Sequence, residues 1–221
     1  MRTIDVISDV ICPWCWIGRA HMTTALAELA SEGLRFSVRW RPFQLNPDMP
    51  AGGVERSTYR MQKFGSLERS RELDARVAEA GRAAGLEFRF DRMLRTPNTL
   101  AAHRVIRMAG EADSGRPGLQ DEVAAALFKA CFHDGEDIGD SAVLDAVAVR
   151  AGLSGVAAML EGEAHLHEVV AEDASARRAG ISGVPSFLMD RHLLFSGAMP
   201  PASMAEAFRR ADAILAEREA A

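Results

Sequence analysis

Two cysteines lie three residues apart near the N-terminus, in the sequence Cys12-Pro13-Trp14-Cys15, between a strand-like segment and a long helical pattern. Side chains at positions i and i+3 of a helix are neighbours, so a disulfide can form between them within the first helical turn. The unpaired N–H groups and the positive end of the helix dipole also favour a thiolate there. The spacing predicts a redox-active dithiol, with Cys12 as the nucleophile and Cys15 as the thiol that resolves the mixed disulfide.

The same pair could also be a buried structural disulfide or half of a zinc site. A structural zinc site built from thiolates needs a second cysteine pair, and the sequence has only Cys131 besides the first two cysteines. Cys131 lies in an apolar helical segment and is expected to be a small buried hydrophobe. Three cysteines are too few for a disulfide-stabilised secreted scaffold. We therefore expect redox chemistry, no metal, and no cofactor beyond the cysteine pair itself.

Three residues close to the cysteines are candidates for supporting roles. Asp9 precedes Cys12 by three residues and is near enough to accept a proton when Cys15 is deprotonated, although an isolated Asp at a strand end is more often a solvated turn or capping residue. Pro13 stiffens the first helical turn and, lacking an N–H, leaves fewer hydrogen bonds on the thiolate. Trp14 is expected to be partly exposed, where it offers apolar contact to a substrate.

The composition limits the classes of partner. The 221 residues are 48% hydrophobic and 26% charged, which is typical of a globular chain with one large domain or two small ones. There are 26 basic and 31 acidic residues, a net charge of -5, and no basic stripe that would suit nucleic acid or an anionic membrane. We therefore expect neither nucleic acid nor a membrane as a partner.

The segment from Met1 to Val6 runs directly into the first predicted strand, without the apolar stretch of a signal peptide. Elsewhere, no apolar run is long enough to cross a bilayer. The protein is therefore expected in the cytoplasm, where a Cys-X-X-Cys pair beside a strand and a helix favours redox chemistry.

The two ends of the chain alternate between strand and helix patterns. Near the N-terminus, a strand over residues 2–8, a helix from 13 to about 30 and a strand over 35–41 form a βαβ unit. Near the C-terminus, two strands over 184–189 and 193–196 precede a helix over 201–218. Together these two halves predict an α/β thioredoxin fold, with a mixed four-stranded sheet flanked by helices.

The middle of the chain reads differently. Residues 42–53 are rich in Pro and Gly and are expected to be irregular, and the pattern from Val54 to Gly180 is helical throughout. Within it, Thr96 is predicted as an N-cap followed by Pro97, and Asp140 as the N-cap of a helix ending near 151. We assign residues 1–53 and 165–221 to a discontinuous thioredoxin-like domain and residues 54–164 to an all-helical insertion.

This arrangement resembles the DsbA family of thioredoxin-fold oxidoreductases. Five segments spread over the chain closely resemble the FrnE-like branch of that family: 8–18, 42–47, 102–104, 180–187 and 196–198. The resemblance implies a cis peptide bond before Pro185, which would leave backbone groups of Val184 free to bind an extended substrate segment. It also implies that His103 faces the cleft between insertion and core, although a satisfied interior histidine is an equal alternative. Many relatives carry a buried acid six residues before the first cysteine, and Val6 stands there instead.

Three functions are compatible with these features. The first is a cytosolic thiol:disulfide oxidoreductase that acts on protein or small-molecule thiols and disulfides, with glutathione as a further co-substrate. The second, from a branch of similar fold, is a glutathione-dependent isomerase or transferase of the 2-hydroxychromene-2-carboxylate isomerase or kappa glutathione transferase type. Such enzymes place a Ser where Cys12 stands, so the dithiol favours the first. The third is a peptide-binding holdase that uses Trp14 and Val184 without chemistry. The direction of electron flow, the electron donor and the oligomeric state stay open.

Overall fold

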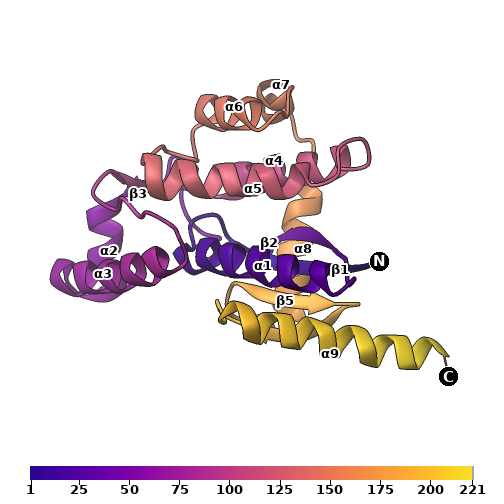
Figure 1. The fold of residues 1–221 in the computed structure, drawn as a ribbon. Coiled ribbons are helices and arrows are strands. Elements are labelled where there is room, and N and C mark those ends of the chain that lie inside the picture. Colours follow the sequence, from indigo (N-terminus) through magenta and orange to yellow (C-terminus); the bar gives the residue numbers. More distant parts are fainter. Residues whose placement is uncertain (221) are drawn as a thin grey trace.

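The computed structural model describes residues 1–220 and contains a four-stranded sheet (Figure 1). Its strands follow the order β2-β1-β5-β6. The parallel pair is β1 with β2, and β5 runs antiparallel to both β1 and β6. Their bounds are Arg2–Ser8 for β1, Phe36–Pro42 for β2, Ser186–Met189 for β5 and His192–Ser196 for β6. The predicted mixed sheet of a thioredoxin fold is confirmed.

Strand β1 carries buried apolar side chains on both faces, and the face of Ile7 also carries Asp5, which pairs with Arg39 of β2. Ile4 and Val6 are almost fully buried in β1, and Ile7 on the opposite face is also buried. The helix α1 (Pro13–Ser31) connects β1 to β2 and packs against α9 (Pro201–Ala220), which follows the sheet at the C-terminal end of the chain (Figure 1). These elements match the sequence prediction to within two residues at each end, because their hydrophobic periodicity is strong.

Between β2 and β5 the chain is mostly helical. Two helices, α2 and α3, lie together at one side of the molecule, and α6 and α7 lie beyond α4 and α5 (Figure 1). The elements and their bounds are α2 (Arg56–Phe64), α3 (Leu67–Ala83), α4 (Leu100–Ala112), α5 (Leu119–Lys129), the π-helical turn η1 (Ala130–Asp134), α6 (Ser141–Arg150), α7 (Val156–Glu161) and α8 (Leu166–Arg178). In the part that the structure describes, no helix is both long and apolar enough to span a bilayer.

The expectation of helix throughout this region is wrong at one place. Two short strands, β3 (Val54–Glu55) and β4 (Arg95–Thr96), pair antiparallel there. Thr96 therefore lies in a strand and caps no helix, and α4 begins at Leu100 after Thr99. The physical reason is Pro97, whose ring disfavours helical backbone in the residue before it and keeps Thr96 extended.

The other predicted cap is confirmed. The carboxylate of Asp140 accepts hydrogen bonds from the backbone N–H groups of Ala142 and Val143 at the start of α6. The division of the chain at residues 53/54 and 164/165 stays a prediction, and α8, which begins next to the second boundary, contacts both β2 and α4.

Candidate active site

Cys12 and Cys15 occupy the first turn of α1. Cys12 is the N-cap residue, with extended backbone angles of φ -90° and ψ 111°, and Pro13 follows at a position where no N–H is needed. The N–H of Cys15 donates to the carbonyl oxygen of Cys12 at 3.0 Å. Both cysteines are free thiols. Cys12 is 5% exposed and Cys15 is 0% exposed. The outer cysteine therefore retains access to a partner, whereas the inner one has none.

The turn before β5 forms the second half of the site. The peptide bond between Val184 and Pro185 is cis, as the resemblance implied. The thiol of Cys12 donates to the carbonyl oxygen of Val184 at 3.6 Å, so the two segments adjoin at the outer sulfur. Gly18 makes the close approach possible, because a Cβ atom there would lie 2.9 Å from Cγ of Pro185. A side chain at position 18 would separate α1 from this turn.

The inner cysteine lies in a closed environment. Burial raises the pKa of Cys15 well above its ordinary value, and the neighbouring Cys12 raises it further. The hydroxyl of Ser8 and the backbone N–H of Asp9 lower this pKa. The Ser8 hydroxyl is itself buried and makes no hydrogen bond of normal distance and angle with the residues that the structure describes. Cys15 therefore stays protonated until a group nearby takes its proton.

Asp9 is fully buried, so it is not solvated, but it does lie in a turn: its backbone oxygen accepts the N–H of Cys12 at 2.9 Å, and its carboxylate accepts that of Ile11 at 3.5 Å. One carboxylate oxygen accepts the N–H of Leu45 at 2.7 Å, and the other lies 3.4 Å from Nε2 of His103. His103, on α4, is 4% exposed. Apart from its contact with Asp9, its Nε2 makes no hydrogen bond of normal distance and angle with the residues that the structure describes. The two supporting residues that the sequence singled out, far apart along the chain, thus form one buried pair beside the dithiol.

A groove of about 420 Å³ opens beside the outer cysteine. Cys12 and Trp14 line one end of it, and Trp14 is 43% exposed, in agreement with the sequence prediction. Aromatic side chains from three further segments form an apolar wall of the groove: Phe64, Phe90 and Phe132. A partner of Cys12 therefore meets a largely apolar surface.

The same groove carries cations from α2 and α3. Arg56, Arg60, Lys63 and Arg76 line it, against the single carboxylate of Asp74. That carboxylate is shared, because Arg56 contacts it at 2.8 Å and Arg60 at 2.6 Å. The lining is thus net positive in a chain of net charge -5. Sequence reasoning missed these residues, although the spacing of i, i+4 and i+7 for the three cations of α2 indicates one shared helix face.

A model of a known family matches residues 3–209 of this chain, described as a DSBA-like thioredoxin domain. That match covers most of the sequence, including the cysteine pair and the cis-proline turn. The chain belongs to this DSBA-like family.

Solved structures agree with the assignment. A probable DsbA oxidoreductase from Streptomyces coelicolor is 29% identical, with a TM-score of 0.84 over 96% of this chain and 90% of that one. A cytosolic disulfide reductase, DsbM, from Pseudomonas aeruginosa, solved with GSH, is 20% identical, with a TM-score of 0.61 over 94% and 98%. A 2-hydroxychromene-2-carboxylate isomerase is 14% identical, with a TM-score of 0.62 over 99% and 98%. The last two likenesses concern the fold alone.

In this DSBA-like chain, an aromatic cluster attaches the dithiol helix to the insertion. Trp16 stacks on Phe132 with ring centres 5.9 Å apart and meets the edge of Phe88 at 4.8 Å. Phe88 in turn stacks on Phe90 at 5.2 Å. Phe90 and Phe132 also line the groove. The cluster therefore couples the position of α1 to the wall that a substrate would touch.

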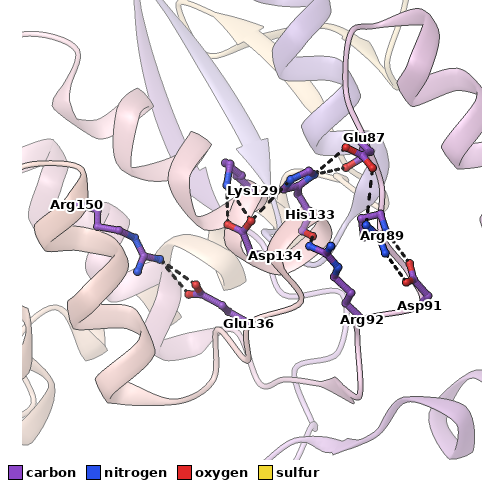
Figure 2. A network of polar contacts seen from close by, with 9 residues as sticks. All are labelled: Glu87, Arg89, Asp91, Arg92, Lys129, His133, Asp134, Glu136 and Arg150. Atoms are coloured by element: carbon purple, nitrogen blue, oxygen red, sulfur yellow. Dashed lines mark hydrogen bonds and ion pairs between the residues drawn. The ribbon is translucent and has the colours of Figure 1, made fainter.

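Polar contacts at the surface hold the backbone that presents these aromatic rings (Figure 2). Lys129 and Asp134 pair at 2.8 Å across the turn η1, and Arg92 donates to the carbonyl oxygen of His133 at 3.2 Å. His133 also contacts the backbone oxygen of Glu87 at 3.2 Å. This network ties η1, which carries Phe132, to the segment that carries Phe88 and Phe90.

The third cysteine plays no visible part in the site. Cys131 lies in η1, is 1% exposed, and burial raises the pKa of its thiol. The expectation of a small buried hydrophobe is confirmed. Among the residues that the structure describes, no group of three or more His, Cys, Asp or Glu side chains is arranged to hold a metal ion.

Proposed function

We propose that this DSBA-like protein is a thiol:disulfide oxidoreductase that works through Cys12 and Cys15. The thiolate of Cys12 attacks a substrate disulfide, forms a mixed disulfide with one sulfur and releases the other as a thiolate. Cys15 then loses its proton, attacks Cys12 and releases the second substrate thiolate, so that two electrons pass from the dithiol to the substrate. The observation that carries this proposal is the asymmetry of the pair, with the outer sulfur beside the groove and the inner one fully buried.

We propose that the substrate binds across the cis-proline turn and the groove. The backbone of Val184, next to Pro185, can form hydrogen bonds with an extended substrate segment. Its carbonyl oxygen already accepts a hydrogen bond from the Cys12 thiol. Trp14 supplies exposed apolar surface, and Pro13 keeps the first turn of α1 rigid. Protein disulfides and small-molecule disulfides both fit this surface.

Glutathione is proposed as one co-substrate. It carries carboxylates, which suit the net positive lining of the groove. The Pseudomonas aeruginosa reductase of similar fold was solved with GSH. No cofactor other than the cysteine pair is proposed. We further propose a cytoplasmic location, action as a reductase or isomerase in that reducing compartment, and membership of the FrnE-like branch.

Turnover of insulin disulfides and of a glutathione mixed disulfide tests this function. Wild-type protein is compared with Cys12→Ser and with Cys131→Ala, which removes the third thiol and serves as the matched control. We expect Cys12→Ser to reduce turnover to the uncatalysed background and Cys131→Ala to retain it. Full activity of Cys12→Ser would overturn the proposal. Activity in a peptide-holding assay would then favour a holdase, and glutathione-dependent isomerisation would favour the isomerase type.

A further inference from the structure

A second cavity, of about 490 Å³, shares no lining residue with the groove. Its wall is formed by strands β1 and β2 and by α4, α5 and α8, and it includes Ser8 and His103. Exposed side chains such as Arg39 and Glu111 also line it, so it reaches solvent. This volume is large enough for several water molecules. Ser8, which adjoins the inner cysteine, therefore borders a cavity that is open to solvent.

Two polar atoms in the lining of this cavity make no hydrogen bond of normal distance and angle with any residue that the structure describes. They are the hydroxyl oxygen of Ser8, in a residue 3% exposed, and Nε2 of His103, in a residue 4% exposed. Buried polar atoms are normally paired, so two unpaired atoms that line one cavity need an explanation, and water in the cavity can hydrogen-bond to both. Ser8 adjoins Cys15, and His103 lies 3.4 Å from the carboxylate of Asp9. Ser8 therefore links the inner sulfur to the cavity, and His103 links Asp9 to the same cavity.

We propose that Ser8, Asp9 and His103 form a proton route that leads from Cys15 to this cavity, away from the substrate groove. The inference rests on the proposed oxidoreductase function and deepens it. When Cys15 attacks the mixed disulfide, the bond between Cys12 and the substrate sulfur breaks and the bond between Cys12 and Cys15 forms. The Cys15 proton passes through the Ser8 hydroxyl to water in the cavity, and His103, which the Asp9 carboxylate positions, receives the proton from that water. The released substrate thiolate takes its own proton from solvent.

A separate route is needed because a bound substrate covers the outer side. In the mixed disulfide, the substrate occupies the groove at Cys12, and Cys15 is 0% exposed. Burial also raises the pKa of Cys15, so its proton does not leave unaided at neutral pH. Ser8 touches a reacting atom, whereas Asp9 and His103 act through it and are positioning residues. This differs from the acid six residues before the first cysteine in many relatives, where this chain has Val6.

The charged groups that face this route come from several elements. On the cavity wall, β2, α4, the turn after it and α8 supply Arg39, Arg41, Arg107, Glu111, Asp113 and Glu172. Arg41 and Arg107 both contact the carboxylate of Glu172, so these charges largely offset one another. Cys131 of η1 also feels the Asp9 carboxylate and remains a thiol, because burial raises its pKa. Cys12 on α1 is a further titratable neighbour.

The test separates the two chemical steps within one reaction. Reduced protein in the Cys131→Ala background is mixed with dithiobis(nitrobenzoate), which releases one coloured thiolate when Cys12 attacks and a second when Cys15 resolves the adduct. We expect His103→Gln, Asp9→Asn and Ser8→Ala each to leave the first release unchanged and to slow the second by about 10-fold or more at neutral pH. The second rate should return toward wild type as pH rises, because hydroxide then takes the Cys15 proton. His21→Gln, on the dithiol helix but bonded to Met199, should change neither step.

Each outcome decides one claim. An unchanged second release with an unchanged pH profile in all three variants overturns the proton route. So does an equal slowing of both releases together with a lower melting temperature, because that pattern indicates a structural role only. Wild-type protein that gives a first release but no second overturns the dithiol function itself.

Discussion

The two sulfurs of the dithiol face opposite kinds of surroundings. Cys12 lies at a groove of about 420 Å³ with aromatic walls and a net positive lining. Cys15 is fully buried and adjoins Ser8, which lines a second cavity of about 490 Å³. The groove suits contact with a substrate, whereas the cavity suits exchange of protons with water. In the mechanism that we propose, one helical turn divides the work, with the substrate sulfur approaching from one side and the proton leaving by the other.

Removal of the inner sulfur should have the largest effect on disulfide turnover. In Cys15→Ala, Cys12 still attacks a disulfide, but nothing resolves the adduct, so we expect one turnover at most and a stable mixed disulfide. Intact-mass measurement after incubation with glutathione disulfide should show one glutathione per chain. Cys12→Ser should show none. If Cys15→Ala instead cycles as wild type does, the assignment of the resolving thiol is wrong.

A methyl group between α1 and the proline turn should have an intermediate effect. In Gly18→Ala, the added Cβ meets the Pro185 ring at 2.9 Å, so either the helix or the turn must move. We expect the free energy of unfolding to fall by about 1–3 kcal/mol, as for other overpacked sites, and disulfide turnover to fall with it. Urea denaturation measures the first effect. The matched control is Gly162→Ala, where a Cβ has no neighbour within 4 Å, and equal effects of both changes would contradict the proposed close approach.

The charge of the groove should have the smallest effect. The chain has only two lysines, Lys63 in the groove and Lys129 outside it, and these form a natural matched pair. We expect Lys63→Gln to slow reaction with an anionic disulfide about threefold at low salt, since unit charges about 6 Å apart attract by about 0.7 kcal/mol in water. Reaction with a cationic disulfide should become faster, and added salt should remove both differences. A similar change in Lys129→Gln would show that the overall charge, and not the groove, is responsible.

Local patterns sufficed to predict much of the site. The two cysteines, Pro13 at the first helical position and the partly exposed Trp14 follow from neighbours in sequence, and the cis bond before Pro185 followed from a resemblance. The paired strands β3 and β4 did not follow, because only two residues form each strand and no period is readable in so short a segment.

Contacts between distant segments are the part that sequence reasoning missed. Asp9 reads as a turn residue by itself, and its burial depends on α4 placing His103 beside it. The groove cations depend in the same way on the packing of α2 and α3 near α1. Such tertiary contacts bring together residues whose own neighbours in sequence carry no sign of the partner.

The central claim is that Cys12 is the reactive sulfur and that Cys15 is shielded until Cys12 is engaged. Alkylation of the fully reduced protein with limiting iodoacetamide at neutral pH, followed by peptide mass spectrometry, tests it most directly. We expect Cys12 to be modified first, with Cys15 and Cys131 protected. Modification of Cys15 as fast as Cys12, or an inert Cys12, would contradict it.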